Sequence, residues 1–152
     1  MSVKSGTVLL VEDNPDDVFF IKWAFKKARL DLTLTVVSDG RDAVDYLQGN
    51  PPYGDRAAYP LPTLIILDLR LPGMHGLEVL RWIRSHPAFQ RLPITILTGS
   101  VIREELNRAY DLGANSFLLK PLSLVDLKNT LQQLTTFWFH AAQLPQIESP
   151  CC

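Results

Sequence analysis

The sequence predicts an α/β fold of the doubly wound (βα)5 type, in which a five-stranded parallel sheet lies between two layers of helices. Five short apolar runs alternate with segments whose apolar residues recur at helical spacing. The runs are apolar almost throughout, which is typical of a parallel sheet covered on both faces. This alternation implies right-handed crossovers between parallel strands. The expected strands are residues 7–11, 33–37, 64–67, 94–98 and 116–119.

The segments between the strands carry helix signals. Asn14 followed by Pro15 is typical of a helix start, because asparagine caps the first turn and proline lacks an N–H that would need a partner there. Ser123 and Asp126 resemble a capping box at the start of the last helix, whose apolar stripe extends to Trp138. Other helices are expected around residues 41–47, 77–83 and 106–110. The loop of residues 48–62 exceeds the usual connection, so we expect a surface excursion with its own role.

Length, composition and charge narrow the class of protein. At 152 residues the chain suffices for one domain with a single buried core, and a hydrophobic fraction of 47% is ordinary for a globular protein. A formal net charge of −1 provides no basic surface for nucleic acid. No apolar run approaches the roughly 20 residues that a membrane span needs. We therefore expect neither nucleic acid nor a membrane among its partners.

Both ends of the chain favour a cytoplasmic location. The N-terminal stretch MSVKSGTVLLVEDN has an apolar run of only four residues before its carboxylates, unlike a signal peptide. Cys151 and Cys152 cannot cross-link a core from the extreme C-terminus, which fits a reducing compartment. A terminal Cys-Cys pair also occurs at lipidation sites, but we interpret it as part of an exposed tail.

Charged and hydroxyl side chains follow the predicted strands at the edge where a doubly wound sheet binds its ligands. Glu12 and Asp13 follow the first strand, Asp68 follows the third, Thr98 ends the fourth and Lys120 follows the fifth. Polar residues also end strands for purely structural reasons. The joint pattern of three carboxylates, a hydroxyl and an ammonium nevertheless favours a site.

The residue types at this edge indicate which ligands the site accepts. Carboxylates held close together repel, so the acidic cluster favours a bound cation. Oxygen ligands with room for water suit Mg²⁺. Lys120 is not needed to hold a metal, and its presence favours an anion such as a phosphoryl group. Thr98 is able to donate a hydrogen bond to that anion.

Four stretches together resemble a response-regulator receiver domain. They are LLVEDN (9–14), ILDLRLPGMHG (66–76), ILTGS (96–100) and FLLKP (117–121), in the order and spacing of that family. The resemblance implies a flavodoxin-like sheet of order 2-1-3-4-5. It divides the chain into an N-terminal tail (1–5), a receiver domain (6–134) and a C-terminal extension (135–152).

The resemblance also implies a role for the residue after the third strand. Asp68 would accept a phosphoryl group from a phosphohistidine of a partner sensor histidine kinase. Glu12, Asp13, Asp68 and the backbone carbonyl of Arg70 would hold Mg²⁺, the implied cofactor. The protein would then be no enzyme beyond its own phosphorylation and slow dephosphorylation.

The remaining site residues would act on the phosphoryl group or transmit its arrival. Lys120 would offset its charge, while Thr98 and Phe117 would switch position. The family's Lys-Pro bond, here Lys120–Pro121, is typically cis. Phe117 lacks the hydroxyl that a tyrosine would supply, and Gly99 leaves space beside the site. His75 replaces a frequent acidic or amide residue, and we interpret it as a solvated loop residue at the start of the third helix.

Three regions resemble, more narrowly, the stand-alone response regulators paired with cyanobacterial phytochrome kinases. They are the 48–62 loop, SHPAFQRLP (85–93) and TFWFHAAQLP (136–145). Three successive aromatics, Phe137 to Phe139, cannot all face one core, so at least one is expected on the surface. We expect a homodimer through the fourth helix, the fifth strand, the fifth helix and this aromatic end.

Other functions remain open at this stage. A phosphatase of the haloacid-dehalogenase type also uses an aspartate at a strand end, but it needs a second acid two residues on, where this chain has Arg70. A phosphate-independent interaction module with the same fold is the other alternative. A nucleotide-binding domain is disfavoured because the turn VEDNPDD (11–17) lacks a glycine-rich loop.

Overall fold

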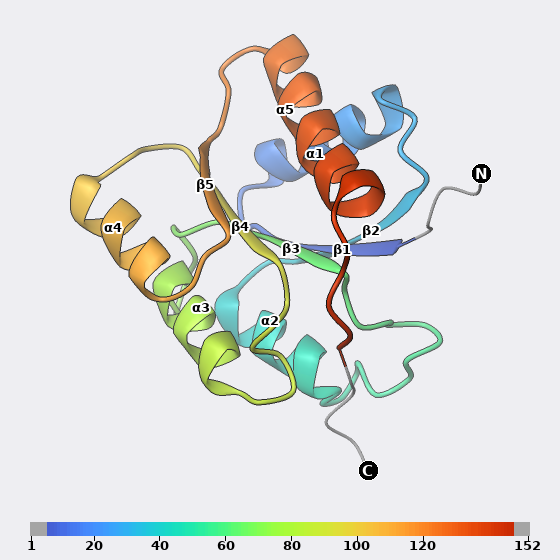
Figure 1. The fold of residues 1–152 in the computed structure, drawn as a ribbon, viewed down its shortest axis with the longest axis vertical. Coiled ribbons are helices and arrows are strands. Elements are labelled where there is room, and N and C mark those ends of the chain that lie inside the picture. Colours follow the sequence, from blue (N-terminus) through green and yellow to red (C-terminus); the bar gives the residue numbers. More distant parts are fainter. Residues whose placement is uncertain (1–5, 148–152) are drawn as a thin grey trace.

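The computed structural model describes residues 6–147 and has one sheet of five parallel strands in the order β2-β1-β3-β4-β5 (Figure 1). This confirms the predicted fold class and strand order. The first two strands begin one residue earlier than expected. The strands are β1 (Gly6–Val11), β2 (Leu32–Val37), β3 (Leu64–Leu67), β4 (Ile94–Thr98) and β5 (Ser116–Leu119).

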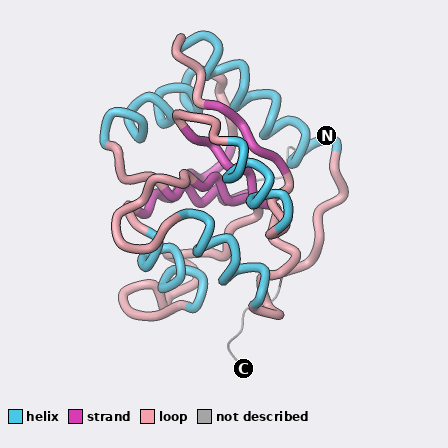
Figure 2. The backbone as a smooth tube through the Cα atoms, turned by 90° about the vertical axis from the view of Figure 1, so that its left-hand side faces the viewer, coloured by secondary structure: helices cyan, strands magenta, loops and turns pink. Residues whose placement is uncertain are grey.

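Helices cover both faces of the sheet. One face carries α1 and α5, and the other carries α2, α3 and α4, so the strands lie in the middle layer in both views (Figures 1 and 2). The helices are α1 (Pro15–Lys27), α2 (Gly40–Gln48), α3 (Gly76–Ser85), α4 (Arg103–Asp111) and α5 (Leu124–Thr136), followed by the π-helical turn η1 (Phe137–Ala141).

The two halves of the core follow from the alternation of side chains along each strand. In β1, Val8 and Leu10 pack with α1 and α5, whereas Leu9 and Val11 pack with α2 and α3. The residues of β3 divide in the same way and are all fully buried. Burying a side chain of this size contributes roughly 1.5–3 kcal/mol, so these strands anchor the edge that carries the site.

Both predicted helix caps are present. The Asn14 side chain accepts hydrogen bonds from the backbone N–H groups of Asp16 and Asp17, at 2.9 and 3.2 Å. Ser123 accepts one from the N–H of Asp126 at 3.0 Å. These bonds satisfy N–H groups that have no partner within their own helix. The first turn of α1 is therefore held directly beside the end of β1.

The 48–62 loop folds against the end of α2. The guanidinium of Arg56 donates to the backbone carbonyls of Tyr46 and Leu47 at 2.8 and 2.6 Å, which satisfies the last turn of that helix. The hydroxyl of Tyr46 donates to the carbonyl of Pro60 at 2.7 Å. The rings of Tyr46 and Tyr53 lie 5.1 Å apart between their centroids. The expected excursion is thus packed onto the domain.

The C-terminal aromatics separate by burial. Phe139 is buried at the beginning of β1, where a Cβ at Gly6 would collide with its ring. Phe137 is 54% exposed, as expected of at least one of the three aromatics, and Trp138 is half-buried. The segment after η1 continues to Ile147, which packs against the core on the α2 and α3 side.

Some expectations concern parts of the chain that the structure leaves undescribed. The tail of residues 1–5 and the Cys151–Cys152 pair lie outside the described residues. Within residues 6–147, no helix combines the length and the apolar character needed to cross a membrane.

Candidate functional site

Backbone pairing just beyond the strands places the predicted site residues at one edge of the sheet. The N–H of Glu12 donates to the carbonyl of Val37 at 3.0 Å, and the N–H of Asp68 donates to that of Val11 at 3.0 Å. The N–H of Lys120 donates to the carbonyl of Thr98 at 2.7 Å. Each side chain therefore begins where its strand ends, as the sequence predicts.

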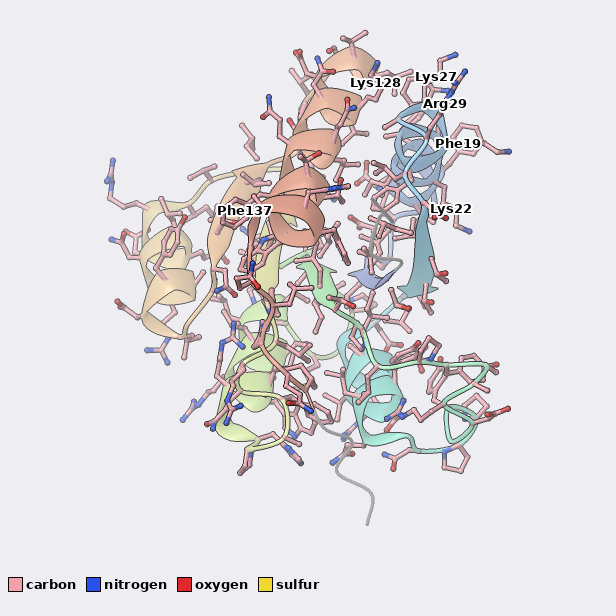
Figure 3. The ribbon with its side chains drawn as sticks, turned by 45° about the vertical axis from the view of Figure 1, so that its right-hand side comes forward. Phe19, Lys22, Lys27, Arg29, Lys128 and Phe137 are labelled. Carbon is pink, nitrogen blue, oxygen red and sulfur yellow. The ribbon has the colours of Figure 1, made fainter. Side chains whose placement is uncertain are left out.

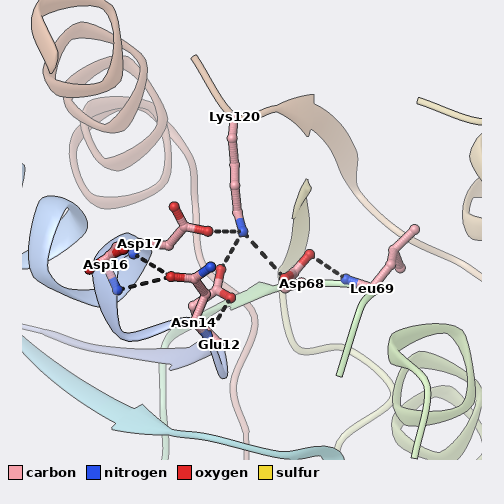
Figure 4. A network of polar contacts seen from close by, with 7 residues as sticks. All are labelled: Glu12, Asn14, Asp16, Asp17, Asp68, Leu69 and Lys120. Atoms are coloured by element: carbon pink, nitrogen blue, oxygen red, sulfur yellow. Dashed lines mark hydrogen bonds and ion pairs between the residues drawn. The ribbon is translucent and has the colours of Figure 1, made fainter. Parts of the chain in front are cut away.

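Lys120 reaches across this edge to three carboxylates (Figure 4). Its Nζ lies 2.6 Å from Oε1 of Glu12, 2.8 Å from Oδ2 of Asp17 and 3.3 Å from Oδ2 of Asp68. A lysine ammonium has three protons, so each is able to meet one carboxylate. The buried charges of Glu12 and Asp68 are thereby partly neutralised.

Burial and pairing shift the protonation of this network. Burial, reinforced by the charge of Asp68, raises the pKa of Glu12 to about 7 against the opposing effect of Lys120. Burial would lower the pKa of Lys120, but its hydrogen bonds to Asp17 and Glu12 outweigh that effect and hold the pKa above its usual value. The ammonium therefore stays charged at neutral pH, while Glu12 titrates there.

The donor set fits a hard divalent cation. Glu12, Asp13 and Asp68 each offer a carboxylate oxygen, and these oxygens all lie within 4.8 Å of one another. Two of the three residues are buried, whereas Asp13 is exposed, so one side of the cluster is open to solvent. Carboxylates with room for water are the ligands that Mg²⁺ prefers. The three predicted carboxylates are therefore brought together.

The two oxygens of Asp68 have different surroundings. Oδ1 accepts a hydrogen bond from the N–H of Leu69 at 2.8 Å, whereas Oδ2 faces Lys120 at the longer distance of 3.3 Å. The loop beyond Asp68 closes back onto it, because the N–H of Gly76 donates to the carbonyl of Leu69 at 3.0 Å. A Cβ at Gly76 would collide with the carbonyl of Asp68. Glycine at position 76 thus lets this loop pack tightly.

Thr98 is buried, and its hydroxyl lacks a hydrogen-bond partner among the described residues. An unpartnered buried hydroxyl is costly, so in a native protein it needs an explanation such as a functional role. Gly99 beside it has no atom within 4 Å of the place where a Cβ would stand, so the expected space is present. Phe117 is half-buried and packs on the α2, α3 and α4 side of the sheet.

The structure assigns contacts to three residues that the sequence pattern does not indicate. Asp17 pairs with Lys120, although an acid in the first turn of a helix is also explained by the helix dipole alone. His75 is the N-cap of α3, because its Nδ1 accepts a hydrogen bond from the N–H of Leu77 at 3.1 Å. Glu105 on α4 accepts two hydrogen bonds from the guanidinium of Arg70, each 2.7 Å long.

One geometric expectation is wrong. Among the described residues the single cis peptide bond joins Pro51 to Pro52, so the Lys120–Pro121 bond is trans. The trans form is favoured by about 0.5–1 kcal/mol before proline. Lys120 reaches all three carboxylates from this geometry.

The fold and the edge residues define a receiver domain. A family model described as the response regulator receiver domain matches residues 8–132, so the chain belongs to this family. This result displaces the haloacid-dehalogenase alternative. At position 70, where such a phosphatase needs its second acid, this chain has an arginine that pairs with Glu105.

Among curated proteins, two relatives are similar over most of their length. The chain is 38% identical over 131 residues to the probable methanogenesis regulatory protein FilR2 of Methanothrix harundinacea, covering 86% of this chain and 82% of that protein. It is 35% identical over 138 residues to the response regulator Rcp1 of Synechocystis sp., covering 91% and 92%.

Solved structures extend the same similarity. The phosphorylated cyanobacterial phytochrome response regulator RcpA matches with a TM-score of 0.85 and 33% identity, over 93% of this chain and 99% of that one. The Mn²⁺-bound form of Rcp1 matches with a TM-score of 0.82 and 34% identity over the same shares. The chain is thus a response regulator of two-component signalling that resembles phytochrome regulators.

Proposed function

We propose that this protein is a single-domain response regulator that accepts a phosphoryl group on Asp68. The observation that carries this proposal is the carboxylate of Asp68, whose Oδ2 faces Lys120 beside two further carboxylates. In the transfer, an oxygen of Asp68 forms a bond to phosphorus and the phosphorus–nitrogen bond of a phosphohistidine breaks. The electron pair of that bond returns to the histidine ring.

The carboxylates of Glu12, Asp13 and Asp68, with the backbone carbonyl of Arg70, are proposed to hold Mg²⁺. When bound, the ion supplies positive charge to the transferring phosphoryl oxygens. Lys120 supplies a second positive charge beside Asp68, whose Oδ2 lies 3.3 Å from its Nζ. The support is the carboxylate cluster itself, together with a Mn²⁺-bound structure of the relative Rcp1.

Thr98 and Phe117 are proposed to pass the arrival of the phosphoryl group to the surface. The unpartnered hydroxyl of Thr98 gains an acceptor when a phosphoryl oxygen arrives at Asp68. A shift of Thr98 leaves room into which the half-buried ring of Phe117 moves. Phosphorylation then changes the populations of two arrangements of the α4 and β5 surface.

Incubation with acetyl phosphate and Mg²⁺ tests the acceptor. Intact-protein mass spectrometry should show the addition of one phosphoryl group to the wild type and none to Asp68→Asn. Asp111→Asn, which changes an exposed aspartate at the end of α4, is the matched control and should remain phosphorylated. Phosphorylation that persists unchanged in Asp68→Asn would refute the proposal and favour a phosphate-independent interaction module.

The proposed donor is a sensor histidine kinase of the phytochrome type. Its support is the similarity to Rcp1 and to the phytochrome response regulator RcpA. This role places the protein in the cytoplasm, where such kinases use ATP. Transfer of labelled phosphate from a purified, autophosphorylated phytochrome kinase should be much faster than transfer from an unrelated histidine kinase. Equal rates would contradict this pairing.

A homodimer through α4, β5 and α5 is the proposed assembly. Tyr110, Leu119 and Phe137 are about half-exposed large apolar side chains on these elements and the adjoining η1. Figure 3 shows Phe137 at the end of the α5 segment and Phe19 on the separate helix α1. Phe139 is excluded from the expected interface because it is buried in the core.

Sedimentation with and without a phosphoryl mimic such as beryllofluoride tests this assembly. Leu119→Asp should weaken the dimer, because it places a charge in the proposed apolar contact. Phe19→Asp is the matched control, since it changes an exposed apolar residue on α1 that is 64% exposed. A dimer weakened by Phe19→Asp alone would move the interface to α1.

A further inference from the structure

Asp17 joins the site from α1, outside the strand ends that supply the other charged residues. Its Oδ2 lies 2.8 Å from Nζ of Lys120, closer than Oδ2 of Asp68 at 3.3 Å. Figure 4 shows the ammonium between Asp17, Glu12 and Asp68. The contact to Asp68 is the longest of the three, so it is the one that Lys120 loses most easily.

Asp17 differs from Glu12 in its surroundings. It is not one of the three carboxylates that gather within 4.8 Å of one another. Its side chain is 35% exposed, whereas that of Glu12 is 1% exposed. Asp17 also lines a pocket of about 390 Å³, together with Phe20, Gly99 and Lys120. Asp17 is thus able to hold the ammonium without serving as a metal ligand.

The start of α1 determines where Asp17 stands. The capping oxygen of Asn14 accepts the N–H groups of both Asp16 and Asp17, which fixes the first turn. Asp16 is the neighbouring acid in that turn and is exposed, and within residues 6–147 its carboxylate forms no ion pair with Lys120. The two aspartates carry the same charge in the same helix turn, so they interact with the helix dipole alike. They differ in the contact to Lys120.

We propose that Asp17 is a positioning residue that holds the ammonium of Lys120 on the α1 side of the site, ready for a phosphoryl group at Asp68. This inference rests on the proposed acceptance of phosphate by Asp68. An arriving phosphoryl oxygen replaces the long contact to Asp68, while Asp17 and Glu12 keep the ammonium in place. Without Asp17, the ammonium is drawn onto Asp68 and shields its attacking oxygen.

The test compares Asp17→Ala with Asp16→Ala in the full chain. Both variants remove one carboxylate from the same helix turn, but only the first removes the contact to Lys120. With acetyl phosphate and saturating Mg²⁺, Asp17→Ala should be phosphorylated about tenfold more slowly, because a misplaced catalytic charge loses this order of rate. Asp16→Ala should stay within about twofold of the wild type, since the ammonium is still held in place.

Two further measurements separate positioning from a structural role. In spectra of ¹⁵N-labelled lysine, the Nζ signal of Lys120 should shift in Asp17→Ala and stay in place in Asp16→Ala. Asp17→Glu should restore part of the rate, because a longer carboxylate still reaches the ammonium. Mn²⁺ affinity should be the same in both alanine variants, since Asp17 is not a metal ligand.

Several results would overturn the inference. These are an unchanged or faster rate in Asp17→Ala, an equal slowing in Asp16→Ala, or an unshifted Lys120 signal. If Asp17→Ala unfolds, Asp17→Asn keeps the side-chain shape and is measured in its place. A wild-type protein that is not phosphorylated, or an Asp68→Asn variant that is, contradicts the proposed function instead. The two failures are therefore distinguishable.

Discussion

The two sides of the site are built differently. On the β1 and β3 side, Glu12 and Asp68 are buried and both contact the ammonium of Lys120. On the β4 and α4 side, the buried hydroxyl of Thr98 lacks a partner in the part of the chain that the structure describes. In that part, Ala109 is also the only fully buried residue of α4, and no side chain caps this helix.

This difference gives the two sides different roles: one side holds the charges in place, and the other responds to a change of charge at the site. A network in which buried polar groups are paired is rigid, because moving one group leaves another unsatisfied. A helix with little buried surface and no cap shifts at low cost, and elements that move in switching belong to this weakly held class. We infer that the carboxylate side stays in place while the Thr98 and α4 side moves.

The largest expected effect comes from the charge of Glu12. Its pKa in the folded protein is raised from 4.5 to about 7, so the folded state binds this proton more tightly than the unfolded chain. The free energy of unfolding therefore falls as the pH rises from 4.5 to 7, by about 3 kcal/mol in all. Glu12→Gln should remove this component.

Chemical denaturation at pH 5 and pH 8, in buffer with a chelator, measures the effect. The wild type should lose about 2–3 kcal/mol more than Glu12→Gln between these two pH values. If the free energy of unfolding changed equally with pH in the two proteins, Glu12 would be ionised across this range. Burial would then raise its pKa less than the structure indicates.

An intermediate effect is expected from two buried threonines of β4. Thr98→Val removes a hydroxyl without a partner, so it should raise the free energy of unfolding by about 1 kcal/mol. Thr95→Val is the matched control, because the hydroxyl of Thr95 accepts a hydrogen bond from Ser116 at 2.9 Å. It should lower the free energy of unfolding by about 1 kcal/mol.

Denaturation with and without beryllofluoride measures both variants. Thr98→Val should also lose the response of the α4 and β5 surface to the mimic, and Thr95→Val should keep it. Equal destabilisation by both substitutions would show that Thr98 is satisfied, for example by water, and would weaken the contrast between the two sides.

The smallest effect on stability is expected at the contact that ties α4 to the loop after Asp68. Glu105 is bound by the guanidinium of Arg70, and its Oε2 lies 3.4 Å from Nε2 of His75. The Arg70 side chain is about half-exposed, so Glu105→Gln should change the free energy of unfolding by less than about 1 kcal/mol. It should nevertheless speed amide hydrogen exchange in α4 and leave α3 unchanged.

Glu104→Gln supplies the control for that exchange experiment. Glu104 is the neighbouring acid of α4 and is exposed, and among the described residues it forms no salt bridge. Faster exchange in both variants would trace the effect to the charge of the helix terminus. Unchanged exchange in Glu105→Gln would mean that α4 is held by packing alone.

The sequence predicts the placement of the edge residues where position follows from strand order. Glu12, Asp68 and Lys120 directly follow a strand, and Thr98 ends one. Parallel topology brings all such residues to one edge, so their proximity needs no knowledge of side-chain geometry. The expected space at Gly99 and the caps at Asn14 and Ser123 are local consequences of residue type, and the structure contains them.

The sequence pattern does not predict contacts between distant segments. The partners of Asp17 and Arg70 lie 103 and 35 residues away in the chain, so no local spacing indicates them. The N-cap contact of His75 is not indicated by its residue type, since serine, threonine, asparagine and aspartate are the preferred N-caps. The burial of Phe139 depends on Gly6, whose missing side chain makes room for the ring.

The course of the C-terminal segment has a practical consequence for measuring this switch. Phe139 anchors the segment at the beginning of β1, and Ile147 rests on the α2 and α3 side. Gly6 begins β1, whereas Asp68 follows the other end of the parallel neighbour β3, so Phe139 and Asp68 lie at opposite edges of the sheet. A fluorescent reporter attached to this segment near Phe139 would therefore leave the surface around Asp68 unobstructed.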